Sequence, residues 1–328
     1  MPDYLADAQQ SANWIASVQL STGAIPWFEG GHLDPWDHVQ AAMGLATVGL
    51  IDEAIGAYDW LRHAQRPDGS WARKYWPGVD DDGIEEHEVD ANYCAYPATG
   101  LWQLHLLGVE TSQFQPMIER AVDVVLELQR GDGPVAWARG LDGRVADECL
   151  ITGNASIAFS LRCAARLAEA WGHPRPHWAH TAEQISAALT DRPELFTPKP
   201  RFSMDWYYPV LAGVLDSDAA RLRLAERWDE FVLAGQGVRC VTVNPWVTGG
   251  ESLELVLALV RNGQRETAEQ IFADISHLRD SDGSWWTGLV VSDQVRWPVE
   301  LSTWTAGTAI LAADALAELT PAAGFLGR

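Results

Sequence analysis

The chain has 328 residues, 47% of them hydrophobic, and carries a formal net charge of −22. This acidic balance argues against binding to nucleic acid or to an anionic membrane, because proteins bind both through clustered Lys and Arg. No apolar run approaches the ~20 residues of a membrane-spanning helix, and the first residues lack the pattern of a signal peptide, so we expect a cytoplasmic protein. The four cysteines are scattered without a CxxC pair, and we expect them to be reduced and mostly buried.

Amphipathic segments alternate along the chain with segments that are apolar nearly all round. In the first kind, apolar residues recur every three or four positions, as in Ile55, Tyr58 and Leu61, which is typical of a helix with one buried face. Segments of the second kind contain glycine, which lets helix backbones approach closely in a crowded inner ring. The predicted helices are, in chain order, outer 3–20, inner 35–49, outer 51–65, inner 91–108, outer 114–130, inner 148–170, outer 177–190, inner 205–215, outer 218–234, inner 248–262, outer 264–279 and inner 300–318.

A similar turn follows several of the outer helices. It reads Gln65-Arg66-Pro67-Asp68-Gly69-Ser70-Trp71 after the second, and related sequences occur at 129–133 and 280–285. Asp-Gly favours a tight turn, and the Trp after it can pack over the helix pair. Six helical hairpins predict an all-α fold, a single (α/α)6 toroid over residues 1–328 with an inner and an outer ring of helices. We expect only the tail over 320–328 to be irregular and poorly ordered.

Acidic and aromatic residues gather at the starts of the six predicted inner helices. In a closed ring all six starts point to one mouth, which would then be lined with carboxylates and indoles, as carbohydrate sites are. The six starts are Asp34-Pro35-Trp36-Asp37-His38, Asp90-Ala91-Asn92-Tyr93, Asp147-Glu148, Ser203-Met204-Asp205-Trp206-Tyr207, Asn244-Pro245-Trp246 with Glu251, and Glu300-Leu301-Ser302-Thr303-Trp304.

Three of these carboxyl groups are the candidates for catalysis. Glycoside hydrolysis needs one carboxyl group that gives a proton and a second that activates water. Asp34 and Asp37 lie at the first inner helix and Glu251 at the fifth, although each also fits a capping role: Asp34 as the N-cap, Asp37 in the first turn, and Glu251 in a capping box with Thr248. Gly249-Gly250 is a poor helix start and indicates close approach by a ligand or by Trp246.

Other residues at these starts are expected to bind the substrate. Aromatic rings offer apolar faces to the CH groups of sugars, and acids can hold sugar hydroxyls. Each has a structural alternative, core packing for the aromatic residues and helix capping for the acids. The predicted substrate-binding residues are Trp36, His38, Tyr93, Asp205, Trp206, Tyr207, Trp246, Glu300 and Trp304, with Asp147, Glu148 and Trp297 as further candidates.

The hairpins and the Asp-Gly-Ser-Trp turns resemble the toroid superfamily of squalene cyclases, protein prenyltransferase β subunits and (α/α)6 glycosidases. Within it, Asp34-Pro35-Trp36-Asp37-His38 and Thr248-Gly249-Gly250-Glu251 are similar to the mycobacterial methylmannose-polysaccharide hydrolases. This resemblance implies an endo-acting α-mannosidase on a cytoplasmic, partly methylated oligo- or polysaccharide. It also implies inversion, with Asp34 or Asp37 as the acid, its pKa raised by the neighbouring acid, and Glu251 as the base.

Two acidic features bear on a metal or cofactor. The run from Asp80 to Glu88 is interpreted as a solvated loop, a lid over the mouth, or a Mg²⁺ site that would suit a diphosphate. Asp147 and Cys149 resemble part of the prenyltransferase zinc site, but no His follows on a later inner helix to complete it. We therefore expect no metal and no cofactor.

Two alternatives from other functional classes remain at this point. One is a terpene cyclase or prenyltransferase-like enzyme, which the scarcity of basic residues at the predicted mouth disfavours. The other is a toroid that binds carbohydrate without cleaving it. The sequence leaves open the exact sugar, the oligomeric state, and the choice between Asp34 and Asp37.

Overall fold

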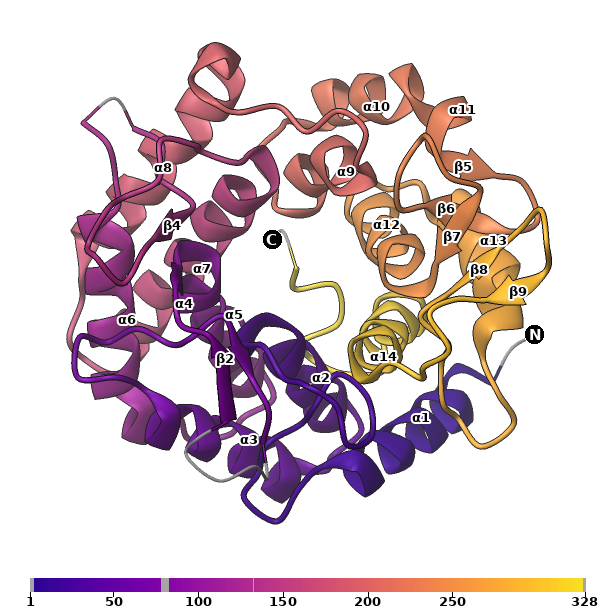
Figure 1. The fold of residues 1–328 in the computed structure, drawn as a ribbon, viewed down its shortest axis with the longest axis horizontal. Helices are drawn as coiled ribbons and strands as arrows, with labels where there is room; N and C mark the ends of the chain where they lie inside the picture. Colours follow the sequence, from indigo (N-terminus) through magenta and orange to yellow (C-terminus); the bar gives the residue numbers. More distant parts are fainter. Residues whose placement is uncertain (1–2, 78–82, 132, 327–328) are drawn as a thin grey trace.

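The protein forms a ring of helices around a central space (Figure 1). The computed structural model describes residues 3–77, 83–131 and 133–326. The inner helices are α2 (Pro35–Thr47), α4 with α5 (Ala91–Ala95 and Pro97–Leu106), α7 (Ile151–Ala170), α9 (Ser203–Leu211), α12 (Gly249–Arg261) and α14 (Thr303–Ala317). The outer helices are α1 (Tyr4–Val18), α3 (Ile51–Ala64), α6 (Gln115–Glu127), α8 (Pro176–Asp191), α10 with α11 (Ser217–Glu226 and Trp228–Phe231) and α13 (Arg265–Ile275).

The inner ring is closed. Each inner helix contacts the next one along the chain, and the last, α14, packs extensively on the first, α2. At that closure a Cβ on Gly44 would lie 2.9 Å from the Cα of Gly307, so only glycine permits the approach. This arrangement confirms the predicted (α/α)6 toroid.

Two predicted helices are interrupted. The inner segment predicted over 91–108 is divided into α4 and α5 at Tyr96, directly before Pro97, which has no N–H to donate. The outer segment predicted over 218–234 is divided into α10 and α11 and ends in a strand.

Short strands, which the sequence analysis did not predict, lie in the connections around the inner-helix starts. β1 pairs with β2, β3 pairs with β4, and β5 to β9 form one antiparallel sheet in chain order. At two or three residues, these strands are too short for an alternating pattern to show. The strands are β1 (Lys74–Tyr75), β2 (Ile84–Glu86), β3 (Val89–Asp90), β4 (Ala138–Arg139), β5 (Val232–Leu233), β6 (Gly237–Arg239), β7 (Trp246–Thr248), β8 (Gly288–Val290) and β9 (Val295–Arg296), and the 3₁₀ turns are η2 (Ser112–Phe114), η3 (Pro193–Leu195) and η4 (Ser276–Leu278).

Glutamines at the ends of outer helices join the outer ring. Gln65 Nε2 donates to the carbonyl of Gly69 in its own turn and to that of Met117 on the next outer helix, both at 2.9 Å. Gln19 bonds in the same way to Gly23 and to Glu53, also at 2.9 Å. These glutamines therefore have a structural role, since they tie α1 to α3 and α3 to α6.

The C-terminal tail is irregular but packed. After α14 it turns into the centre of the ring (Figure 1), where Phe325 and Leu326 are buried. The ring of Phe325 lies 6.3 Å from that of Phe159 on α7. The expectation that this tail would be poorly ordered is wrong for residues 320–326, because its apolar side chains complete the core at the carboxyl ends of the inner helices.

Candidate active site

The first acid pair lies at the start of α2. Asp34 is the N-cap, and its Oδ1 accepts a hydrogen bond of 3.0 Å from the backbone N–H of Asp37. Asp37 is half-buried one turn further on, and its pKa lies well above the usual value because the carboxyl is desolvated and lies beside Asp34. This shift favours the protonated form of Asp37, which is the form that a general acid needs.

The second acid pair lies in the first turns of α12. Glu251 is only 6% exposed, and its buried Oε2 has no hydrogen-bond partner. The capping box does not form, because the Thr248 side chain makes no cap hydrogen bond and its Oγ1 is also unpartnered. Local helix chemistry thus does not account for Glu251, and its free oxygen points to a functional role.

Glu254 completes this pair and was missed in the sequence analysis. It is 1% exposed, its Oε2 accepts a hydrogen bond of 2.5 Å from the Tyr207 hydroxyl, and its Oε1 has no partner. Burial, together with the nearby Glu251, raises its pKa to about 8. Its position could have revealed it, because it is the one polar residue in the otherwise apolar 253–260 segment and lies about one helical turn after Glu251.

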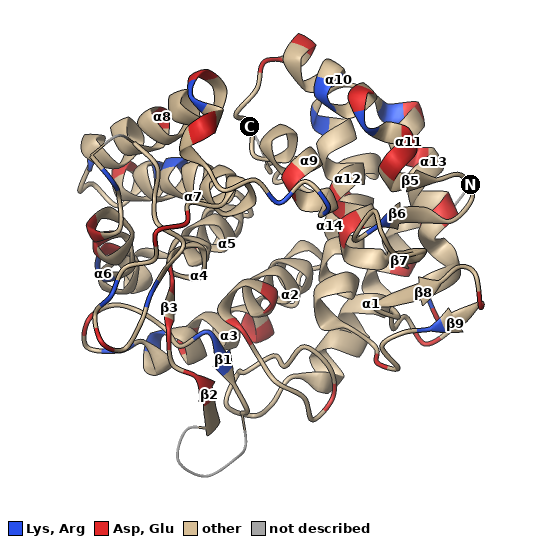
Figure 2. Cartoon of the chain, turned by 45° about the horizontal axis from the view of Figure 1, so that its top comes forward, with Lys and Arg blue, Asp and Glu red and all other residues tan. Residues whose placement is uncertain are grey.

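The two pairs meet across the mouth. Glu254 and Glu251 both raise the pKa of Asp37 further, so the carboxyls of α2 and α12 are electrostatically close although α14 lies between the two helices in the ring. Figure 2 shows acidic segments of α2 and beside α12 around the central space, whereas Lys and Arg lie mostly on outer elements such as α10.

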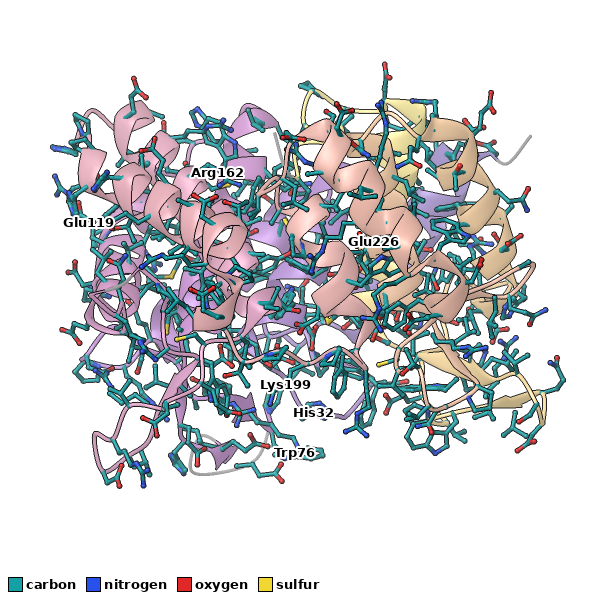
Figure 3. The ribbon with its side chains drawn as sticks, turned by 90° about the horizontal axis from the view of Figure 1, so that it is seen from above. His32, Trp76, Glu119, Arg162, Lys199 and Glu226 are labelled. Atoms are coloured by element: carbon teal, nitrogen blue, oxygen red, sulfur yellow. The ribbon has the colours of Figure 1, made fainter. Side chains whose placement is uncertain are left out.

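Aromatic side chains form the wall of the mouth over α14. The rings of Trp27 and Trp304 lie 5.5 Å apart, and His32 stacks on Trp27 at 5.8 Å. Glu300 holds this wall, because its Oε1 accepts hydrogen bonds from Trp27 Nε1 at 2.8 Å and from Thr287 Oγ1 at 3.1 Å. Figure 3 shows His32 at one edge of the molecule, together with Trp76 and Lys199, so this edge carries the mouth loops.

The glycine pair before Glu251 accommodates this aromatic wall. A Cβ on Gly250 would lie 2.2 Å from Cη2 of Trp304, so glycine is needed for the indole to lie against α12. The close partner is thus Trp304, not Trp246 as one alternative had it. Trp246 lies further out on β7, where it is half-buried and its Nε1 donates to the carbonyl of Trp297 at 2.7 Å.

Trp36 and Tyr93 form the opposite side of the mouth. Both are half-buried, and their rings meet edge to face at 6.5 Å. Burial raises the pKa of the Tyr93 phenol well above its usual value, and so do Asp34, Asp90 and Asp37. Tyr93 is therefore a neutral hydroxyl directly beside the acid pair of α2.

Three predicted substrate-binding residues face away from the mouth. His38 is 1% exposed, with Nδ1 accepting from the Ile25 N–H at 3.1 Å and Nε2 bonded to the Ala57 carbonyl at 2.9 Å, and burial lowers its pKa to about 4. Trp206 is also 1% exposed and stacks on Phe231, while Tyr207 is fully buried against Glu254. Each lies on a helix face turned to the protein interior, so none offers a surface to a sugar.

Asp205 and Glu148, two of the remaining predicted acids, make hydrogen bonds or ion pairs within the protein. Asp205 has both oxygens bonded, to Thr152 Oγ1 at 2.8 Å and to the Lys199 backbone N–H at 2.6 Å. Asp147 and Glu148 are exposed, and Glu148 pairs with the Lys199 ammonium at 3.2 Å. These contacts give Asp205 and Glu148 a structural role.

No metal site is evident in the part of the chain that the structure describes. Its His, Cys, Asp and Glu residues include no group of three that could hold an ion. Asp80 to Asp82 of the acidic run lie outside the described residues, and Glu85 bonds to Trp76 Nε1 at 2.6 Å and to Lys74 at 2.9 Å. None of the described helices is both long and apolar enough to cross a membrane.

Comparison with known proteins identifies the family. No family model matches the chain. The chain is 48% identical over 321 residues to the MMP endo-(1,4)-3-O-methyl-α-D-mannosidase of Mycolicibacterium hassiacum, which covers 97% of this chain and 88% of that protein. The chain belongs to this family. As a member of the endo-mannosidase family it is a glycoside hydrolase, which sets aside the prenyltransferase-like and the non-catalytic alternatives.

Solved structures agree on the architecture. A wild-type glycosidase superimposes with a TM-score of 0.75 over 96% of this chain and 97% of its own, at 15% identity. The GH63 mannosylglycerate hydrolase from Thermus thermophilus gives a TM-score of 0.71 over 92% of this chain and 99% of its own, also at 15% identity. At such low identity these neighbours support the toroid fold alone.

Proposed function

We propose that this endo-mannosidase family member cleaves internal α-1,4 linkages of a 3-O-methylated mannan by inversion, with Asp37 as the general acid and Glu251 as the general base. One observation carries the assignment of roles. A carboxyl with a strongly raised pKa on α2 shares the mouth with a carboxylate on α12 that has a buried, unpartnered oxygen. Asp34, which the sequence analysis left as an alternative acid, supports Asp37 because its Oδ1 caps the helix.

The division of labour follows from the environments of the two groups. Protonated Asp37 gives its proton to the glycosidic oxygen as the bond to the anomeric carbon breaks. Glu251 accepts a proton through Oε2 from a water molecule that attacks the same carbon from the opposite face. The negative charge of Asp34 keeps the proton on Asp37 until the leaving group takes it.

The proposed substrate rests on the relative and on the surface of the mouth. The relative that shares 48% identity acts, by its name, on a 3-O-methyl-α-D-mannose polymer. Trp36, Tyr93 and the wall formed by Trp27 and Trp304 offer aromatic faces that suit the CH groups and methyl ethers of such a chain.

Product analysis tests this proposal. Oligosaccharides of α-1,4-linked 3-O-methylmannose, and their unmethylated counterparts, are incubated with the enzyme, and products are sized by mass spectrometry. We expect short oligosaccharides from internal cleavage, and proton NMR at early times should show a newly formed β reducing end. An initial α product would contradict inversion, and release of single sugars alone would contradict endo action.

A cytoplasmic location stays a prediction. Cys94, Cys163 and Cys240 are free thiols, as expected in a reducing compartment.

A further inference from the structure

A cavity of about 150 Å³ lies beside the acid pair of α2, between the starts of α4 and α7. The hydrolytic steps above do not use it. Trp36 and Tyr93 line it, and Tyr93 links it to the acid pair, because Asp34 and Asp37 act electrostatically on its phenol. The cavity is smaller than the ~300 Å³ at which binding sites for larger ligands begin, so it suits one part of a sugar chain.

Two side chains that line this cavity have polar atoms without a partner in the protein, Trp36 through Nε1 and Asn92 through its whole amide. Asn92 is 5% exposed, and neither its Nδ2 nor its Oδ1 makes a hydrogen bond. A buried amide left unpartnered is costly, so such groups in folded proteins call for an explanation. A ligand that both donates to and accepts from this amide provides one.

A second asparagine on the same cavity shows the contrast. Asn154 on α7 donates from Nδ2 to the carbonyls of Val135 and Leu150, both at 2.9 Å, and accepts from the Val135 N–H at 2.8 Å. Its amide is satisfied by the fold and has a structural role. Asn92 lines the same space with both amide atoms free, so the two residues serve different purposes.

The other walls combine apolar and aromatic side chains with two polar ones, Asp90 and Thr152. Leu150 and Ile157 contribute aliphatic surface, and the indole of Trp137 is held in place by the Arg73 guanidinium 5.0 Å above it. A free amide among such walls suits a group with adjacent polar and apolar parts. A methyl ether on a pyranose ring has this character, since its methyl group packs on the walls while the neighbouring oxygens bond to the amide.

We propose that this cavity is the subsite for the O-methyl-bearing sugar of the substrate, with Asn92 holding the ring oxygens and the Trp137–Leu150–Ile157 wall taking the methyl group. The inference rests on the proposed function and names the part of the enzyme that separates methylated from unmethylated mannan. An apolar pocket distinguishes ligands that differ by one carbon by about tenfold or more.

Gly153 allows the cavity to be filled. It lines the cavity in the first turn of α7, and a Cβ there would meet only Leu150 Cβ at 3.9 Å, an ordinary contact. Gly153→Leu should lower kcat/KM on the 3-O-methylated oligosaccharide at least tenfold and remove the preference for this substrate over the unmethylated one. The control is Ala170→Leu, which adds the same side chain at an exposed position of the same helix and should change neither value.

Asn92→Ala and Asn154→Ala form a second matched pair. Asn92→Ala should weaken turnover of the methylated substrate without lowering Tm, because the protein loses no hydrogen bond. Asn154→Ala should lower Tm, because it removes three hydrogen bonds of the fold. An equal fall in Tm for both would make Asn92 a structural residue and overturn its assigned role.

Binding separates this inference from the proposed function. Calorimetry measures the affinity of methylated and unmethylated α-1,4-mannotetraose for the wild type and for Gly153→Leu. If the wild type prefers the methylated sugar but cleaves neither, the proposed function fails and the subsite is supported, provided that Gly153→Leu abolishes the preference. Equal affinities in the wild type, or a preference that survives in Gly153→Leu, overturn the subsite.

Discussion

The two acid pairs of the mouth share a spacing but differ in how the protein uses them. Asp34 and Asp37 on α2, like Glu251 and Glu254 on α12, are three residues apart, so each pair occupies one face of its helix. In both, the second residue has the raised pKa. The first residue differs, because Asp34 is engaged as a helix cap whereas Glu251 keeps an unpartnered oxygen.

In the proposed mechanism this difference corresponds to a proton donor on α2 and a proton acceptor on α12. On α2, Asp34 is engaged as the helix cap and raises the pKa of Asp37, the proposed proton donor. On α12, Glu251, the proposed base, keeps an unpartnered oxygen, and Glu254 is buried against the Tyr207 hydroxyl. The same three-residue spacing is thus proposed to give a general acid on α2 and a general base on α12, because the hydrogen-bond partners of the two pairs differ.

The largest expected effect comes from neutralising the two proposed catalytic groups. Asp37→Asn and Glu251→Gln should each lower kcat on the methylated oligosaccharide by about 10³-fold, because each removes a proton-transfer group. Circular dichroism should show unchanged folding. Activity within tenfold of the wild type in either variant would remove that residue from the mechanism.

The roles of acid and base can be separated with a better leaving group. An aryl oligomannoside whose phenol leaves without protonation should restore much of the activity of Asp37→Asn. It should restore little in Glu251→Gln, because attack by water still needs the base. Initial rates on the aryl and natural substrates give the comparison, and the reverse pattern would exchange the two assignments.

Glu254 should make stability depend on pH. Its pKa of about 8 in the folded protein is raised from an ordinary value near 4.5, so the folded state gains protons relative to the unfolded state between these values. Its stabilising contribution is complete below pH 4.5 and is lost as the pH rises through 8.

Glu254→Gln replaces the carboxyl group with an amide that does not ionise, so this loss of stability at high pH should disappear. The variant should gain on the order of 3 kcal/mol over the wild type between pH 5 and pH 9, seen as a smaller fall in Tm across that range. The exposed Glu226→Gln serves as the control and should follow the wild type. Parallel Tm curves for Glu254→Gln and the wild type would show that Glu254 is ionised at neutral pH.

Asp34 offers the smallest and most selective change. Asp34→Asn keeps a capping side chain but removes the charge that raises the pKa of Asp37, so the alkaline limb of kcat/KM should move to lower pH. Asp34→Ala should show the same movement and lose a further ~1 kcal/mol of stability with the cap. A pH profile that does not move would show that Asp34 acts only as a cap.

The sequence was sufficient to predict the ring and the positions of several acids at the inner-helix starts, because both depend on local patterns. Helical periodicity and the turn at Gln65 to Trp71 indicated the hairpins, and helix starts located Asp34, Asp37 and Glu251. The capping alternative was correct for Asp34 and wrong for Glu251, a distinction that depends on side-chain geometry.

The errors have a common cause in helix geometry. His38 follows Asp37 directly, but one residue turns a helix by about 100°, which carries its side chain to the outer ring. Trp206 and Tyr207 were assigned to the mouth by the same nearness in sequence. Glu254, one full turn beyond Glu251, was overlooked although it shares its face.

The buried tail also has a practical consequence for handling the protein. The last described residues lie at the centre of the ring, whereas α1 lies in its outer layer (Figure 1). A truncation that removes Phe325 and Leu326 would take two buried apolar side chains from the core. Shortened versions of the protein should therefore keep these two residues.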